Sequence, residues 1–226
     1  MAKLHFTDAE RAQVTAAVVA AERATDGEIV TILSDRSDAY HDVSLHYAVG
    51  AMLALVAAFA AWPGILEAGL AWFHGGWSVA SELHQLLFLV LAGEAIVFLI
   101  VRYALAWGPL RMLLTPGSTK SRRVRRRALQ FFKSSAEKRT AGRVGILLYL
   151  SLAERRAEII ADAAIHGLVP EERWGDAMAA LIVGLRAGEA ARGMANAVGQ
   201  IALILEEHFP KTEHDVNELP DRLIEV

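Results

Sequence analysis

Five polar residues that can bind an anion or a cation gather around one predicted turn. They are Ser151, Glu154, Arg155, Arg156 and Asp162. Arginine can hold a phosphate group through two parallel hydrogen bonds, and a nearby carboxylate can bind a divalent cation or activate a water molecule. The favoured interpretation of this pattern is a solvated turn with a surface ion pair. The alternative is a phosphate site with Asp162, Arg155 and Arg156 as its catalytic residues.

A further carboxylate, Asp35, directly follows the β-rich run 28–34. Ligands of open α/β sheets bind at the ends of strands. If the strands that carry Asp35 and Asp162 are neighbours, these two residues approach each other. With Glu154 they would form an oxygen-rich metal site, and magnesium or calcium is the cofactor that such ligands favour.

Short helices and strands surround these residues. Thr7 and Glu10 have the spacing of a capping box, which predicts a helix over 8–24. Apolar β-rich runs predict strands over 28–34, 144–151 and 157–164, the last two as a hairpin whose first strand is central. Helical patterns cover 171–187 and 188–207, and no element is predicted for the last sixteen residues. This order predicts an α/β fold, a small sheet with helices packed on it.

A hydrophobic block interrupts this fold. Two apolar runs, 47–66 and 86–107, are each about long enough to cross a bilayer. They divide the chain into an N-terminal part of the domain (1–44), a transmembrane hairpin (45–110) and a C-terminal part (111–226). Because two spans return the chain to the same side, the two flanking parts can form one domain.

Charge sets the expected orientation. Residues 67–85 contain no Lys or Arg, whereas residues 111–143 carry eleven basic residues and one acidic residue. The positive-inside rule then predicts that both termini are cytoplasmic, in a multi-pass membrane protein. Beyond Pro116-Gly117 the basic run is expected to continue as an amphipathic helix to about Thr140, of the kind whose apolar side a bilayer interface accepts. Membrane lipid is the expected partner of the basic run, and nucleic acid is the less favoured alternative. The membrane-interface residues are Arg122, Arg123, Arg125, Arg126 and Arg127.

Glu94 lies near the middle of the second predicted span. An ionisable group at that depth is costly, which makes it a candidate for an ion- or proton-linked function. The alternative is a protonated carboxyl group that bonds to the other span or to a second copy of the chain, so a homo-oligomer is a possible assembly.

The chain has no cysteine, which excludes disulfides, thiolate catalysis and Cys-ligated metal sites. It also lacks a P-loop, a dinucleotide-binding glycine fingerprint, His-Glu-x-x-His and Gly-x-Ser-x-Gly. These absences argue against NTPase, dehydrogenase, zincin and serine-hydrolase chemistry.

Several segments together resemble the TPM domain family, in its membrane-inserted bacterial branch. They are GRVGILLYLSLAERRAEIIAD, GLVPEERW, the late Phe209-Pro210 and the ending NELPDRLIEV. The resemblance implies an α/β/α sandwich around a short, mostly parallel sheet, and weak phosphatase activity in some members. Two loops depart from the family pattern, because the chain reads Arg143-Val144-Gly145 and Ala164-Ile165-His166-Gly167.

These observations lead to one main hypothesis and two alternatives. The main hypothesis is an integral TPM-domain protein of the bacterial inner membrane that acts in the interaction or assembly of other membrane proteins. The first alternative is a divalent-cation-dependent phosphatase, and whether the protein is an enzyme is left open. The second alternative is an ion- or proton-linked membrane component that uses Glu94.

Overall fold

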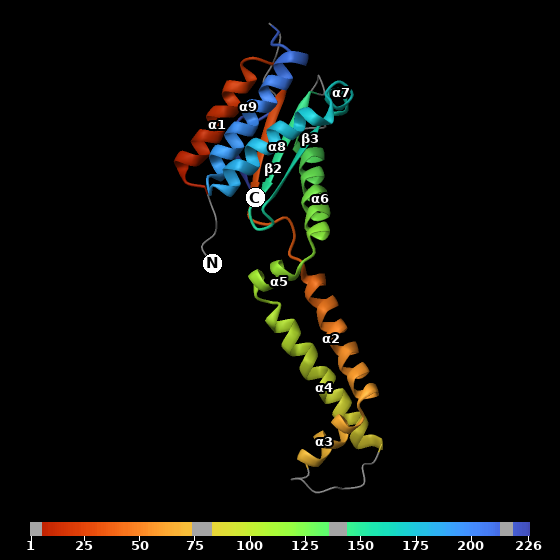
Figure 1. Ribbon diagram of the computed structural model, residues 1–226. Coiled ribbons are helices and arrows are strands. Elements are labelled where there is room, and N and C mark those ends of the chain that lie inside the picture. Colours follow the sequence, from red (N-terminus) through yellow and green to blue (C-terminus); the bar gives the residue numbers. More distant parts are fainter. Residues whose placement is uncertain (1–5, 74–82, 136–143, 213–218) are drawn as a thin grey trace. The chain divides into compact units, whose positions relative to one another are not determined.

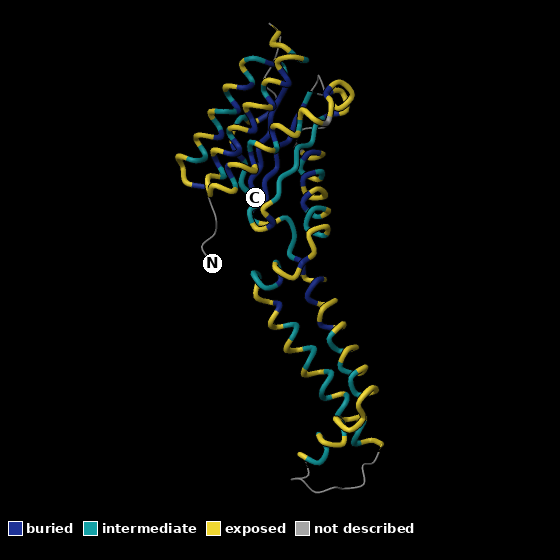
Figure 2. Tube along the Cα trace, viewed as in Figure 1, coloured by how far each residue is buried: buried dark blue, intermediate teal, exposed yellow. Residues whose placement is uncertain are grey.

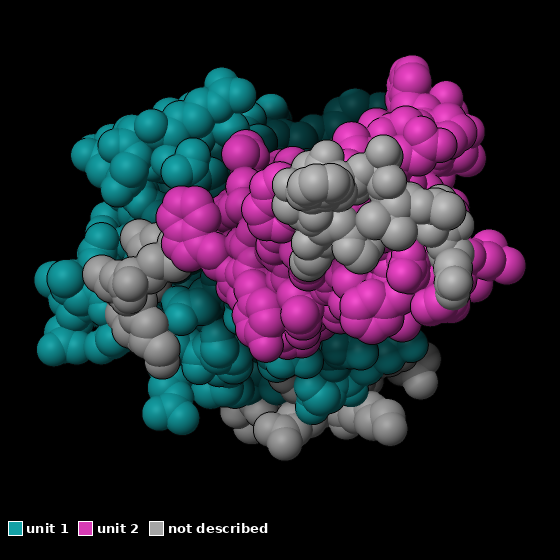
Figure 3. Space-filling model, turned by 90° about the horizontal axis from the view of Figure 1, so that it is seen from below, with its two compact units in different colours: residues 1–38, 117–226 teal, residues 39–116 magenta. Residues whose placement is uncertain are grey.

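The computed structural model describes residues 6–73, 83–135, 144–212 and 219–226 (Figure 1). The chain forms two compact units, which Figure 3 distinguishes by colour. Unit 1 combines residues 1–38 with 117–226, and unit 2 holds residues 39–116. Unit 2 is therefore an insertion into the sequence of unit 1.

A four-stranded sheet forms the centre of unit 1. Its strands are β1 (Glu28–Ser34), β2 (Gly145–Ser151), β3 (Arg156–Ala161) and the short β4 (Ile224–Glu225), in the order β3-β2-β1-β4. β1 runs parallel to β2 and β4, and β2 pairs with β3 in antiparallel fashion. Every residue of β1 and β2 is buried, as expected for central strands covered on both faces.

Three helices cover one face of the sheet: α1 (Asp8–Glu22), α8 (Glu171–Arg186) and α9 (Ala190–His208) (Figure 1). Because side chains alternate between the two faces of a strand, Ile29 and Leu33 of β1 point to this face and share one core with the helices. The buried core residues from β2 are Ile146, Leu148 and Leu150, and those from α9 include Met194, Val198 and Ile201. The short helix α7 (Ala163–His166) follows β3.

Helix α6 (Gly117–Ser135) covers the opposite face and completes an α/β/α arrangement. Val124, Ala128 and Phe132 of α6 are buried in a second cluster with Val30, Ile32, Leu147 and Tyr149 of the sheet. The sequence suggested that the apolar positions of this basic helix enter a bilayer. The structure corrects that interpretation, because these positions pack on the sheet and leave the basic side facing outward.

The predicted fold class is confirmed, including its layers and the insertion after the first strand. β1 has the predicted bounds, and the capping box forms, with the Glu10 amide 3.3 Å from Thr7 Oγ1 and the Thr7 amide 2.8 Å from Glu10 Oε2. The structure adds β4, which the sequence did not predict. It pairs Ile224 with Ile32 and Glu225 with Leu33.

Thr31 offers a test of the sheet core. Its side chain is 1% exposed and its Oγ1 is buried without a hydrogen-bond partner among the described residues. Thr31→Val replaces this hydroxyl with a methyl group of similar shape, so we expect unchanged or higher stability, by up to about 1 kcal/mol. Urea unfolding of both proteins in detergent measures the change. Thr25→Val, which removes the hydroxyl that donates to the Phe209 carbonyl, is the destabilising control.

Unit 2 consists of α2 (His41–Ala61), α3 (Gly64–Phe73), α4 (Leu83–Ala104) and α5 (Gly108–Leu114). α2 begins and ends earlier than the predicted span 47–66. It ends at Ala61 because Trp62 precedes Pro63, and helical geometry is disfavoured for a residue before proline. α4 also begins and ends earlier than the second predicted span, 86–107. The two long helices pack together, and a Cβ on Gly93 would lie 3.3 Å from Leu55.

Helices α2 and α4 are long and apolar enough to cross a membrane. A core helix of a soluble protein would be mostly buried. In the most apolar stretch of α2 only 17% is buried, and in that of α4 the share is 0%. Figure 2 shows this contrast with the buried sheet. Large apolar side chains, including Leu53, Phe88 and Leu91, are exposed along both helices. Exposed apolar surface of this extent marks contact with a membrane or with another protein.

Candidate functional site

The carboxyl ends of β1 and β2 lie side by side, because Ser34 pairs with Ser151 in the parallel register. The turn between β2 and β3 folds over the residues that follow β1. The Leu152 amide donates to the Ser34 carbonyl and the Ala153 amide to the Asp35 carbonyl, each at 3.0 Å. Asp35 and the predicted turn residues therefore meet at one end of the sheet.

Glu154 is the best-anchored side chain at this end, and it is 6% exposed. Its Oε1 accepts a hydrogen bond from the Ser37 amide at 2.9 Å, and its Oε2 accepts one from the Ser151 hydroxyl. The Ser37 hydroxyl in turn lies 3.0 Å from the Tyr149 hydroxyl. This buried network ties the loop after β1 to the hairpin turn.

The two arginines of the turn differ in environment. Arg155 is exposed and has a φ of 50°, a left-handed conformation that is uncommon for a residue with a side chain. Arg156 is half-buried, and its Nε has no hydrogen-bond partner among the described residues. A Cβ on Gly117 would lie 3.2 Å from Arg156 Nη2, so the guanidinium rests against the start of α6.

Asp162 lies at the other end of the sheet. It follows β3, whose antiparallel register places Arg156 opposite Ser151 and Ala161 opposite Ile146. Its Oδ2 accepts from the Gly145 amide at 3.2 Å. Six residues of strand span roughly 20 Å, so the predicted approach of Asp162 to Asp35, Arg155 and Arg156 is wrong.

A magnesium or calcium site with Asp35, Glu154 and Asp162 as ligands does not fit this arrangement. Asp162 is at the opposite end, and both Glu154 oxygens already accept hydrogen bonds. Within the described ranges, no group of three or more His, Cys, Asp or Glu side chains is arranged to hold a metal ion.

Comparison with known proteins finds a family model that matches part of the chain. Residues 109–204 match the family model of the TPM domain. The chain contains a TPM domain. The structure is also similar to the NMR structure of BA42 protein from the psychrophilic bacterium Bizionia argentinensis, with a TM-score of 0.57 and 16% identity over 100% of both chains. At that identity the likeness shows the fold alone. No curated protein matches the chain.

The matched segment covers only part of unit 1. It ends within α9, whereas α1, β1 and β4 lie outside it. The structure places these elements in the same unit, with β1 between β2 and β4. In the sequence, the inserted unit 2 therefore separates β1 from the other strands of unit 1.

The arginines of α6 surround the point where the chain leaves this TPM domain. Arg123 and Arg126 each form an ion pair with Asp38 at 3.0 Å, and Arg125 pairs with Glu158 at 3.3 Å. Arg127 stacks over the Phe131 ring, 4.6 Å from its centroid. Arg122 is exposed. Sequence reasoning missed Ser37 and Asp38, because nothing in a short polar loop indicates its distant partners.

Glu94 lies in α4 beside Gly93, which packs against Leu55 and Phe59 of α2. Its Oε1 is buried without a hydrogen-bond partner in the part of the chain that the structure describes. The predicted bond between Glu94 and the other span is therefore not seen among these residues.

Removing the Glu154 carboxylate tests the network at the strand ends. Glu154→Ala leaves the Ser37 amide and the Ser151 hydroxyl without their acceptor, so we expect a loss of about 2 kcal/mol in unfolding free energy. Urea unfolding of the full chain in detergent measures it. Glu172→Ala, at an exposed position of α8, is the control, and equal stability of the two variants would contradict the network.

Proposed function

We propose that this protein is an integral protein of a bacterial inner membrane whose TPM domain acts in the interaction or assembly of other membrane proteins. The insertion of the apolar unit between β1 and α6 carries the proposal. Because the domain is completed only by segments from both sides of the insertion, two spans must return the chain to one face of the membrane. The basic run after the second span favours the cytoplasmic face.

The end of the sheet supports a binding role over catalysis. Glu154 is buried and uses both oxygens, and Arg123, Arg125 and Arg126 have carboxylate partners. A general base or a nucleophile must be within reach of a substrate. The side chains that remain available to a ligand are chiefly those of Asp35 and Arg155, which together suit recognition better than bond cleavage.

Anionic lipid is the proposed partner of the outward side of α6. The apolar positions of α6 pack on the sheet, so its contact with lipid depends on charge. This attraction contributes roughly 1 kcal/mol per arginine near the membrane surface. Arg122 and Arg127 are exposed on this helix. Native mass spectrometry of the purified chain should detect fewer bound anionic lipids for Arg122→Gln/Arg127→Gln. The matched control Arg173→Gln/Arg192→Gln should retain them, and an equal loss in both would count against the proposal.

The assembly role is tested in native membranes. The tagged full chain is cross-linked in cells and isolated in nanodiscs excised without detergent, beside an unrelated two-span protein expressed at the same level. We expect specific membrane proteins at constant stoichiometry with the TPM-domain protein only. Repeated recovery of the chain without a membrane partner would refute this role.

Phosphoester hydrolysis is the second candidate. The observation that favours it is the meeting of Asp35 and the Arg155 turn at the carboxyl ends of β1 and β2, where α/β sheets bind ligands. Purified protein is assayed on a broad phosphoester panel with magnesium, calcium or manganese. Activity that Asp35→Asn abolishes would support it, and no hydrolysis under any condition would exclude it.

A further inference from the structure

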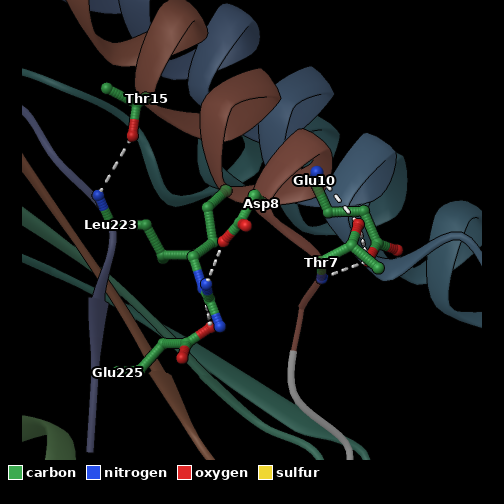
Figure 4. Close-up of polar contacts among 7 residues, drawn as sticks. Thr7, Asp8, Glu10, Thr15, Leu223 and Glu225 are labelled. Atoms are coloured by element: carbon green, nitrogen blue, oxygen red, sulfur yellow. Dashed lines mark hydrogen bonds and ion pairs between the residues drawn. The ribbon is translucent and has the colours of Figure 1, made fainter.

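The last residues of the sequence are held on the sheet by contacts with several elements. We define the strap as residues 219–226, which include β4. The Val226 amide donates to the Leu33 carbonyl at 3.0 Å, and the Leu223 amide donates to Thr15 Oγ1 at 3.4 Å. Arg11 of α1 joins the strap through Glu225 at 3.0 Å (Figure 4). Leu219 and Leu223 are buried.

Three carboxylates from three elements meet at the start of this strap. They are Glu22 at the end of α1, Glu28 at the start of β1 and Asp221 in the strap. Glu28 is 6% exposed, and one of its oxygens accepts from the Leu219 amide at 3.3 Å. Glu22 Oε1 accepts from the Ile29 amide at 2.9 Å, and no N–H or O–H donor reaches its buried Oε2 among the described residues. The Glu22 and Asp221 side chains also form a hydrogen bond, which two carboxyl groups can make only when one of them is protonated.

The charge on Glu22 depends on pH in the physiological range. Burial raises the pKa of Glu22 to about 8, against the lowering effect of the Ile29 amide, and the charges of Glu28 and Asp221 add to the rise. The basic residues that adjoin Glu22 and Asp221 in the sequence, Arg23 and Arg222, are exposed, and Lys211 contacts the Thr25 carbonyl. Below pH 8 Glu22 is mainly neutral, and above it the carboxylate repels Asp221.

We propose that the Glu22, Glu28 and Asp221 cluster is a proton-dependent latch that holds the strap on β1 and releases it as pH rises. Release uncovers the edge of β1 at Ile32 and Leu33, whose backbone groups then become available to an extended partner segment. The direction follows from linkage, because a carboxyl group with a raised pKa in the attached state binds its proton best in that state.

Hydrogen exchange of the full chain in detergent tests the latch, with rates at pH 6 and pH 9 converted to protection factors. If release lowers the pKa of Glu22 by about one unit, the release equilibrium rises about tenfold. We therefore expect protection of the peptide 219–226 to fall by about that factor, while protection of β2 is retained. Glu22→Gln should abolish the fall.

Two further variants keep the test decisive. Glu158→Gln is the matched control, because Glu158 is also a half-buried glutamate whose pKa burial raises, and it faces Arg125 rather than the strap. Asp221→Asn removes the repelled group and should reduce the pH dependence even if Glu22→Gln folds poorly, while the part of the pKa rise that comes from burial of Glu22 remains. Equal protection at both pH values, the same fall in Glu22→Gln as in the parent, or a parallel loss across β2 would overturn the proposal.

Discussion

Phe132→Ala is expected to lower the unfolding free energy by about 3–5 kcal/mol, which corresponds to a fall in Tm of roughly 10 °C. Phe132 is 6% exposed and packs in the cluster that joins α6 to the sheet. Truncation opens a cavity between these layers, and the loss includes the transfer and the cavity contributions. Thermal unfolding in detergent, followed by circular dichroism, measures the effect.

Phe132→Ala also distinguishes packing of α6 on the sheet from entry of its apolar side into lipid. If Phe132 entered lipid instead of packing on the sheet, Phe132→Ala would weaken membrane association and leave the stability of the domain nearly unchanged. Leu168→Ala, at a position that is 57% exposed, serves as the control for loss of an apolar side chain. A Tm within 2 °C of the parent for Phe132→Ala, roughly the effect of 1 kcal/mol or less, would contradict the α/β/α packing.

Gly184→Val is expected to destabilise the domain by about 3 kcal/mol or more. Helices α8 and α9 approach so closely that a Cβ on Gly184 would lie 2.4 Å from Gly193 Cα and 2.6 Å from its amide nitrogen. Backbone atoms cannot turn aside as a side chain can, so the helices must separate and lose their packing. Urea unfolding measures the change.

The control for this prediction is Gly199→Val in α9, because a Cβ there meets nothing within 4 Å. Both variants make the same change in helix propensity, so the difference between them isolates the close approach. Similar stabilities for the two would contradict the contact between Gly184 and Gly193.

The sequence predicted elements whose signals are local. Thr7 and Glu10 form their capping box, and β1 is an uninterrupted β-rich run between turn residues. β4 has only two paired residues, too few for a periodic pattern. The pattern of α6 was recognised as amphipathic, but periodicity does not specify whether Val124 and Phe132 face lipid or a sheet.

The candidate site was less predictable than the fold. The turn with Glu154 and Arg155 was found, and its neighbour Asp35 depends on the register of parallel strands. Asp162 could have been excluded from sequence, since the predicted strand between it and Arg156 already keeps them apart. Ser37 and Asp38 become meaningful only when the fold brings their partners to them.

The position of unit 2 also imposes an order on biosynthesis. β1 leaves the ribosome before both apolar helices, whereas its neighbour β2 follows them. At about 5–20 residues per second, the ribosome leaves this apolar strand without its partner for several seconds. Synthesis of both apolar helices must therefore precede closure of the sheet, and β1 cannot pair with β2 until that moment.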